Sequence, residues 1–284
     1  MNSQKVAVIA DSGCDVSKFL AEKLDIRILP LKVIFGDRVC SDGYDIPLSD
    51  IYGSYPDKLP TTSTPNVSEA LDLITQLRGE GYEKLLFITI SSGLSSTNNN
   101  IRLALDEIED MEGHVFDTKD ISIGAGFFAV WAASKLQEGM PLADVLTGLE
   151  DRLYDSHVFF YMDTLNYLRA GGRIGNVVGI VGEALHLKPI ISCNREGIYY
   201  PVSMIRGKKN GLKKLISTAV SNAKGSKIWL ALMNGGAPEE AENIRSALME
   251  AVPNGTIITS GQIAASLAIH TGPGLVGIGV FRFE

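Results

Sequence analysis

The chain has 284 residues, 45% hydrophobic and 21% charged, which is ordinary for a globular protein with a sizeable core. Its net charge of −7 argues against a general nucleic-acid-binding protein. The apolar run at 6–10 is short and no run approaches the roughly 18 residues of a membrane span, so neither a signal peptide nor a membrane helix is expected. Cys14, Cys40 and Cys193 lack metal-like spacing, so we expect no disulfide framework and no metal site, and a cytoplasmic location fits.

The first half of the chain alternates between short apolar strands and amphipathic helices. Hydrophobic periodicity predicts strands at 5–10, 28–35, 84–90 and 114–116. Helices are expected at 16–24, with Asp15 as the N-cap, and at 67–78, 97–108, 124–136 and 142–152. Apolar strands that alternate with helices are typical of a parallel sheet covered on both faces. Residues 1–155 are therefore predicted to form a three-layer, Rossmann-like α/β domain.

The second half has a different pattern. Strands are expected at 158–161, 189–194, 197–200, 228–233 and 276–283, and helices at 207–222 and 238–251. The turn residues of 192–197, between two of these strands, indicate an antiparallel hairpin. Residues 156–284 are therefore predicted to form a second α/β domain with a mixed or antiparallel sheet.

Polar residues follow three of the predicted parallel strands: Asp11-Ser12, Ser91-Ser92-Gly93 and Asp117-Thr118. Ligands of open parallel sheets bind beyond the carboxyl ends of the strands. A further segment, 61–65, offers four hydroxyl groups before a helix. Short polar side chains before helices are also common N-caps, so the convergence predicts a site without fixing its chemistry.

Two interpretations of Ser95 remain open at this point. The stretch Gly93-Leu94-Ser95-Ser96-Thr97 approaches the nucleophile elbow of α/β hydrolases but lacks its last glycine. In that interpretation His270 is the base, oriented by Asp11 or Asp117. Alternatively, hydroxyl groups, a histidine and backbone N–H groups at a helix start bind a carboxylate or phosphate, as in a regulatory module for a small anion.

The segment 197–238 carries seven basic residues and no acidic one. Such a run is commonly a solvated helix face. It also fits a surface for an acidic partner or a phosphate group.

Ten short motifs occur in an order and spacing that resemble the DegV family, the fatty-acid-binding subunits of bacterial fatty acid kinase. These motifs are Ala10-Asp11-Ser12 with Asp15, 28–33, 41–46, Thr62-Ser63-Thr64-Pro65, 90–95, Asp117-Thr118, Gly171-Gly172-Arg173-Ile174, Lys188-Pro189-Ile190, Arg206-Gly207 and His270-Thr271-Gly272-Pro273-Gly274.

The resemblance implies two α/β domains with one long-chain fatty acid, such as palmitate, stearate or oleate, in the cleft between them. It implies that Thr62, Ser95 and His270 hold the carboxylate, with the Ser96 N–H as an extra donor. Ser63, Arg173 and Thr271 are expected near the site, and the residues expected to face the partner are Arg206, Lys208 and Lys209.

The same resemblance implies a carrier with no cofactor and no catalytic residues of its own. A separate kinase subunit would carry ATP and form acyl phosphate for phospholipid synthesis. No nucleic acid is expected as a partner, and contact with a membrane surface would be transient.

The sequence departs from the family pattern at several positions. Ser96 stands where glycine is frequent, Asn98-Asn99 stands where Tyr-Gln or a similar pair is frequent, and Gly13-Cys14 stands where Thr-Ala is usual. These changes concern the shape of the pocket, and therefore the preferred acyl chain. Candidates for small residues along an acyl tunnel are Gly126, Ala129, Gly175, Gly179, Gly182 and Ala184.

Overall fold

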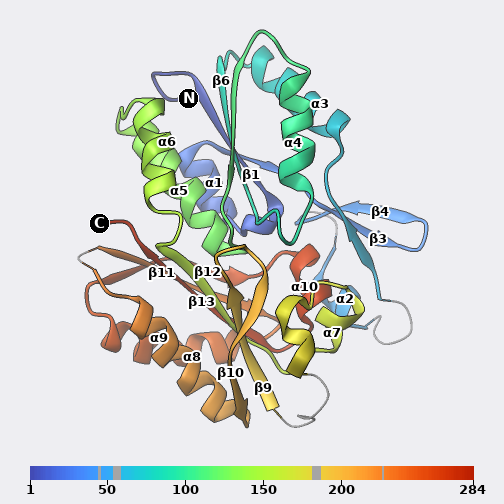
Figure 1. Ribbon diagram of the computed structural model, residues 1–284, viewed down its shortest axis with the longest axis vertical. Helices are drawn as coiled ribbons and strands as arrows, with labels where there is room; N and C mark the ends of the chain where they lie inside the picture. Colours follow the sequence, from blue (N-terminus) through green and yellow to red (C-terminus); the bar gives the residue numbers. More distant parts are fainter. Residues whose placement is uncertain (44–45, 54–58, 181–186, 226) are drawn as a thin grey trace.

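The computed structural model describes residues 1–43, 46–53, 59–180, 187–225 and 227–284. The predicted tunnel residues Gly182 and Ala184 lie outside this range. Within it, the strands form sheets of four, six and three strands. The four-stranded sheet occupies the upper half of Figure 1, the six-stranded sheet the lower half, and the three-stranded sheet projects to the right.

The four-stranded sheet is parallel throughout, with the order β2-β1-β6-β7. Its strands are β1 (Val6–Asp11), β2 (Ile26–Leu29), β6 (Lys84–Thr89) and β7 (Glu112–Asp117). The central strand β1 is buried at all six positions, because helices cover both of its faces. Val6, Val8 and Ala10 belong to one apolar cluster, while Ala7 and Ile9 face another.

Five helices accompany this sheet, and they are α1 (Lys18–Leu24), α3 (Val67–Gly79), α4 (Thr97–Asp106), α5 (Ile123–Gln137) and α6 (Leu142–Asp151). Helices α3 and α4 cover one face through residues such as Ile74, Leu77 and Ile101. Helices α1 and α5 pack on the other face. The helix α3 begins with a capping box between Asn66 and Glu69, which satisfies backbone N–H groups at its first turn.

The six-stranded sheet has the order β10-β9-β8-β13-β11-β12. Its strands are β8 (Ser156–Tyr161), β9 (Leu187–Cys193), β10 (Tyr199–Arg206), β11 (Ile228–Gly235), β12 (Gly255–Gln262) and β13 (Leu275–Arg282). Only the β11–β12 pair is parallel within the described sheet. Helices α8 (Lys208–Asn222) and α9 (Pro238–Ala251) cover one face.

Helix α5 is nearly all buried and lies between the two large sheets. Its Phe127 and Ile123 approach β13 so closely that a Cβ on Gly279 would lie 2.7 Å from Ile123. One apolar cluster consequently extends from β1 through α5 to β8. The parallel sheet expected in the first half and the mixed sheet expected in the second are both confirmed. The domain boundary near residue 155 stays a prediction.

The small sheet has the order β4-β3-β5 and is antiparallel. It comprises β3 (Lys32–Phe35), β4 (Arg38–Ser41) and β5 (Thr61–Ser63), and α2 (Leu48–Gly53) follows β4. We expected one extended segment over 28–35, but the chain divides it between β2 and β3. Pro30 lies at the division, where the fixed φ of proline and its missing N–H suit a break between strands.

The prediction that Asp15 caps the first helix was wrong. Ser17 is the N-cap of α1, and its side chain accepts a hydrogen bond from the Leu20 N–H. Asp15 instead has a left-handed backbone, and its carboxyl group accepts hydrogen bonds from the Ser122 hydroxyl at 2.5 Å and the Ala264 N–H at 2.7 Å. A short 3₁₀ helix, η1 (Ser12–Cys14), occupies the expected turn.

Three short helical elements lie near the junction of the two large sheets. They are α7 (Asn166–Ala170), η2 (Gly175–Ile180) and α10 (Ala265–Thr271). None was predicted from the sequence. Helix α10 is only seven residues long and buried at six of them, so it has no polar face to produce a helical period.

Candidate functional site

A cavity of about 70 Å³ lies where β5, the loop before α4, α10 and the start of β10 meet. It brings together five of the residues named from the sequence, which are Thr62, Ser63, Ser95, Arg173 and His270. Five aliphatic side chains also line it: Leu31, Ile90, Leu94, Ile121 and Leu267. Thr64, Tyr199 and Ser266 complete the lining. The site therefore combines hydroxyl groups and an imidazole with an apolar wall.

Thr62 and His270 come from distant parts of the chain and contact each other directly. Strand β5 pairs with β3, which places Thr62 opposite the buried Val33. His270 lies in the last turn of α10, and its Nε2 is 3.0 Å from the Thr62 Oγ1. Burial, and secondarily the charge of Arg173, lower the pKa of His270 to about 4. The imidazole is therefore neutral at pH 7, and Arg173 is the one charged side chain of the described lining.

Gly171 lies against the other side of this imidazole. The His270 Nδ1 is buried and has no hydrogen-bond partner among the described residues. A Cβ on Gly171 would lie 2.0 Å from that nitrogen. The absence of a side chain at 171 thus permits the ring to lie where its Nε2 reaches Thr62.

Replacing Gly171 by alanine is expected to push His270 away from Thr62 and to lower the free energy of unfolding by about 1–3 kcal/mol. The same substitution in a His270→Ala background is expected to cost under about 1 kcal/mol, since the clashing ring is gone. Denaturant unfolding of the four proteins of this double-mutant cycle measures both effects. Equal costs in the two backgrounds would contradict the proposed contact.

Ser95 follows strand β6 in a tight turn. Its N–H donates to the Ser91 carbonyl at 3.1 Å, and its Oγ lies 2.8 Å from the Thr97 Oγ1 in the first turn of α4. Ser96 occupies the N-cap position of α4 and is exposed. Its side chain does not line the cavity, and its N–H has no acceptor among the described residues. That N–H remains available to a ligand, as expected for a helix start.

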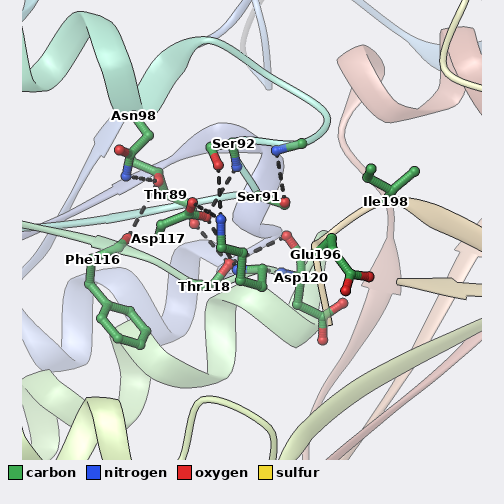
Figure 2. Close-up of polar contacts among 12 residues, drawn as sticks. Thr89, Ser91, Ser92, Asn98, Phe116, Asp117, Thr118, Asp120, Glu196 and Ile198 are labelled. Atoms are coloured by element: carbon green, nitrogen blue, oxygen red, sulfur yellow. Dashed lines mark hydrogen bonds and ion pairs between the residues drawn. The ribbon is translucent and has the colours of Figure 1, made fainter. Parts of the chain in front are cut away.

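The polar residues at the ends of β6 and β7 do converge, but they bind one another. The Ser92 N–H donates to Asp117 at 3.0 Å (Figure 2). Lys119 bridges the same carboxylate and the Ser92 hydroxyl. Thr118 donates to the Thr89 carbonyl at 2.8 Å. This cluster fixes the loop that carries Ser95 and does not belong to the cavity lining.

The remaining residues expected near the site differ in position. Ser63 and the exposed Arg173 both line the cavity, and Arg173 donates to the Gly171 carbonyl at 2.9 Å. Thr271 is buried, and its hydroxyl donates to the Leu267 carbonyl at 3.1 Å. It is not part of the lining, so its role in the structure is to close the last turn of α10.

The three basic residues expected to face a partner lie together at the junction of β10 and α8. Arg206 ends β10, while Lys208 and Lys209 begin α8. Lys208 forms an ion pair with Glu240 of α9. Arg206 and Lys209 are exposed and form no ion pair within the described part of the chain.

The geometry does not provide the contacts that a hydrolase would need. The nearest hydroxyl partner of the His270 Nε2 is Thr62, and Ser95 pairs with Thr97 instead. The Nδ1 of His270 has no carboxylate partner among the described residues. Asp11 accepts from the Ile90 N–H and Asp117 binds Lys119, so neither orients the imidazole. A serine without a base at hydrogen-bond distance is a weak nucleophile.

Four residues of the lining escaped the sequence analysis, and they are Ile121, Tyr199, Ser266 and Leu267. Tyr199 and Ile121 reach the cavity from β10 and from the segment after β7. Both lie close in the chain to motifs that were noticed, the hairpin turn and Asp117-Thr118. Ligands of a parallel sheet bind beyond the carboxyl ends of its strands. The position of Ile121 shortly after β7 is the signal that could have identified it.

No helix among the described residues has the length and apolar character needed to cross a membrane. The same residues contain no group of three or more His, Cys, Asp or Glu side chains arranged to hold a metal ion. All three cysteines are free.

Known proteins match this chain over almost its whole length. Residues 5–282 match the family model described as "Uncharacterised protein, DegV family COG1307". A DegV domain-containing protein of Clostridium perfringens is 37% identical over 277 residues, covering 98% of each chain.

Two solved structures are also similar. A DegV family protein of Thermus thermophilus, described as fatty-acid binding, superposes with a TM-score of 0.92 at 27% identity, covering 99% of this chain and 100% of the other. A stearic-acid-binding protein of Eubacterium ventriosum has a TM-score of 0.88 at 25% identity and 98% coverage of both chains. The family model and the relatives each cover almost the whole chain, and the chain belongs to the DegV family.

Proposed function

We propose that this protein binds one long-chain fatty acid and presents its carboxylate to a separate ATP-dependent kinase subunit. The observation that carries the proposal is the pairing of Thr62 with a neutral His270 in an apolar-walled cavity that Ser95 also lines. Similar proteins bind fatty acids, including stearic acid. Palmitate, stearate and oleate are the ligands that we propose for this chain.

The carboxylate lies between Thr62, Ser95 and His270 in this proposal, and the Ser96 N–H supplies a further donor. These donors are uncharged, so they satisfy the carboxylate oxygens without committing them to a fixed ion pair. The start of α4 adds the positive end of a helix dipole. One carboxylate oxygen therefore stays available for transfer of a phosphoryl group.

The acyl tail supplies most of the affinity. Burying about 15 methylene groups at ~0.8 kcal/mol each gives roughly 12 kcal/mol before ordering costs, whereas micromolar binding needs only ~8 kcal/mol. The present cavity, at about 70 Å³, accommodates the carboxyl end and the first carbons. The remaining carbons displace apolar side chains of the cavity lining. Ligand binding thereby makes a minor, more open conformation the dominant one.

The kinase contact is proposed for the exposed basic residues Arg206 and Lys209. Both lie on the six-stranded half of the molecule, outside the cavity. Cationic side chains without an internal partner suit an acidic protein surface or the phosphates of ATP. The chain itself forms no acyl phosphate in this proposal, and it acts in the cytoplasm on acids destined for phospholipids, with transient contact at a membrane surface.

Native mass spectrometry of the gently purified protein tests the carrier function. One fatty acid per chain is expected, identified after extraction of the lipid. An apo protein that does not bind added palmitate or oleate would contradict the proposal. Labelling of Ser95 by a fluorophosphonate would favour a hydrolase instead.

Ser95→Ala is expected to retain most of the bound lipid, because the tail supplies the affinity, and to reduce acyl-phosphate formation by the kinase at least ten-fold. Ser92→Ala is the matched control, since it removes the same group from the same loop but outside the cavity. Co-purified lipid and acyl phosphate are measured for each variant. Normal turnover in Ser95→Ala would remove this residue from the site.

A further inference from the structure

Carboxyl groups from the first half of the chain hold the start of α10. The N-cap residue of α10 is Ala264, whose side chain forms no hydrogen bond. Asp15 instead accepts from the Ala264 N–H at 2.7 Å, and Asp42 accepts from the Ser266 N–H at 3.0 Å. The first N–H groups of a helix need such partners because they have none inside the helix. The position of α10 therefore depends on side chains that are distant in the sequence.

The carboxyl group of Asp42 joins three parts of the fold. Its Oδ2 accepts from the hydroxyl groups of Ser12 at 2.7 Å and Ser266 at 2.5 Å, and its Oδ1 accepts from the Ser266 N–H. Asp42 is 0% exposed, and a buried polar group is costly unless it is hydrogen-bonded. These three donors satisfy both oxygens. Asp42 thus connects η1, the end of β4 and the start of α10.

The small sheet contacts α10 at two points that lie about one helical turn apart. Asp42 directly follows β4 and binds Ser266, while Thr62 of β5 lies 3.0 Å from His270. Ser266 and His270 are separated by one turn and both line the cavity, so they share a face of α10. Strands β4 and β5 both pair with β3, which joins the two contacts through one sheet. The bonds between Asp42 and Ser266 consequently restrict how far His270 can lie from Thr62.

We propose that Asp42 is a positioning residue for the carboxylate site, because its bonds to Ser266 hold α10 against the small sheet and keep His270 within hydrogen-bond distance of Thr62. This inference rests on the proposed fatty-acid binding and adds a residue that does not touch the ligand. Asp42 does not line the cavity, so its effect passes through α10. A displacement of about 1 Å in this pair would misplace the ligand carboxylate for phosphoryl transfer, while the contacts of the acyl tail would persist.

Asp42→Asn tests the proposal, because the amide places an NH₂ group where one of the oxygens accepts hydrogen bonds. NMR titration of the delipidated protein measures the pKa of His270, and the spectrum of His270→Ala identifies its signal. We expect the ring to move away from Thr62 and become hydrated, which raises its pKa from about 4 toward the ordinary value of 6.5. Removing an acidic side chain cannot raise this pKa directly, since the loss of a negative charge lowers the pKa of a histidine.

Ser12→Ala is the matched control. It removes one donor to the same carboxyl group and deprives the Leu31 N–H of its acceptor at 2.9 Å, but it keeps both bonds between Asp42 and Ser266. We expect it to destabilise the protein in denaturant unfolding while the pKa of His270 stays at about 4. If Asp42 had a merely structural role, the two variants would give the same His270 titration.

The second measurement separates binding from phosphoryl transfer. Asp42→Asn is expected to bind palmitate within about three-fold of the wild-type affinity, and to support acyl-phosphate formation by the kinase about ten-fold more slowly. An unchanged pKa of His270 in Asp42→Asn, or an equal rise in Ser12→Ala, would overturn the inference. A raised pKa with normal turnover would overturn it as well.

A further variant covers the case in which Asp42→Asn does not fold. Ser266→Ala removes one of the two bonds from the side of the helix, and the pKa of His270 is expected to change in the same direction. Wild-type protein that binds no fatty acid would instead count against the proposed function. The His270 titration needs neither lipid nor kinase, so it would still decide whether Asp42 positions the imidazole.

Discussion

Gly197→Ala is expected to lower the free energy of unfolding by about 3 kcal/mol. Gly197 ends the turn between β9 and β10 with a φ of +75°, a region that costs other residues about 1–2 kcal/mol. A Cβ there would also lie 1.9 Å from the Oγ of the buried Ser91, and such overpacking costs typically 1–3 kcal/mol. Figure 2 shows Ser91 beside Glu196 at this contact.

The contact matters for function because it joins the two halves of the cavity. The turn belongs to the hairpin that carries Tyr199, and Ser91 begins the loop that carries Ser95. Separating them by a methyl group moves one wall of the cavity from the other. Gly197→Ala is therefore expected to weaken palmitate binding as well as folding, both measured on the same preparation.

Gly36→Ala is the matched control for Gly197→Ala. Gly36 also has a positive φ, of +56°, but a Cβ there would meet nothing within 4 Å. Its expected cost is the conformational term alone, about 1 kcal/mol. Denaturant unfolding compares the two variants, and equal costs would show that the Ser91 contact carries no energy.

Between pH 4.5 and pH 8, the free energy of unfolding of the wild-type protein is expected to fall by about 3 kcal/mol relative to that of Asp11→Asn. Asp11 is 2% exposed, and its Oδ2 accepts from the Ile90 N–H at 2.9 Å. Burial raises the pKa of Asp11 from 3.8 to about 7, although the hydrogen bonds from the Ile90 and Gly13 N–H groups lower it. Between these two pKa values, each pH unit changes the free energy of unfolding by about 1.4 kcal/mol.

The direction follows from the protons bound in each state. Between pH 3.8 and 7 the folded protein holds a proton on Asp11 that the unfolded chain has released, so stability falls as the pH rises through this range. His270 acts in the opposite direction between about pH 4 and 6.5, because the unfolded chain then binds the extra proton. Its contribution cancels when the wild-type protein and the Asp11 variant are compared at each pH.

Asp117→Asn serves as the control for the pH series. Burial raises the pKa of Asp117, but hydrogen bonds from Lys119 and Ser92 outweigh this effect and hold the pKa below its ordinary value. Asp117 is therefore ionised in both states above pH 4.5, and its variant should show a constant difference from the wild-type protein. A constant difference for Asp11→Asn as well would contradict a protonated Asp11 in the folded protein.

Local sequence patterns were enough to predict the α/β class, the alternation of parallel strands and helices in the first half, and the β9–β10 hairpin. Each of these features depends on hydrophobic periodicity or turn residues within about twenty residues of chain, so it can be predicted locally. The motifs around Thr62, Ser95 and His270 were also visible in the sequence, and it was their resemblance to a known family that named these three residues as a site.

How the motifs contact one another depends on packing between distant parts of the chain. Thr62 and His270 are 208 positions apart in the chain, and nothing local to either one indicates that their side chains lie 3.0 Å apart. Asp15 has the composition of an N-cap, yet it binds Ser122 and Ala264. Tyr199 resembles any strand aromatic, and only packing makes it part of the cavity lining. Long-range packing chooses among several locally acceptable hydrogen-bond partners, and that choice leaves no periodic trace in the sequence.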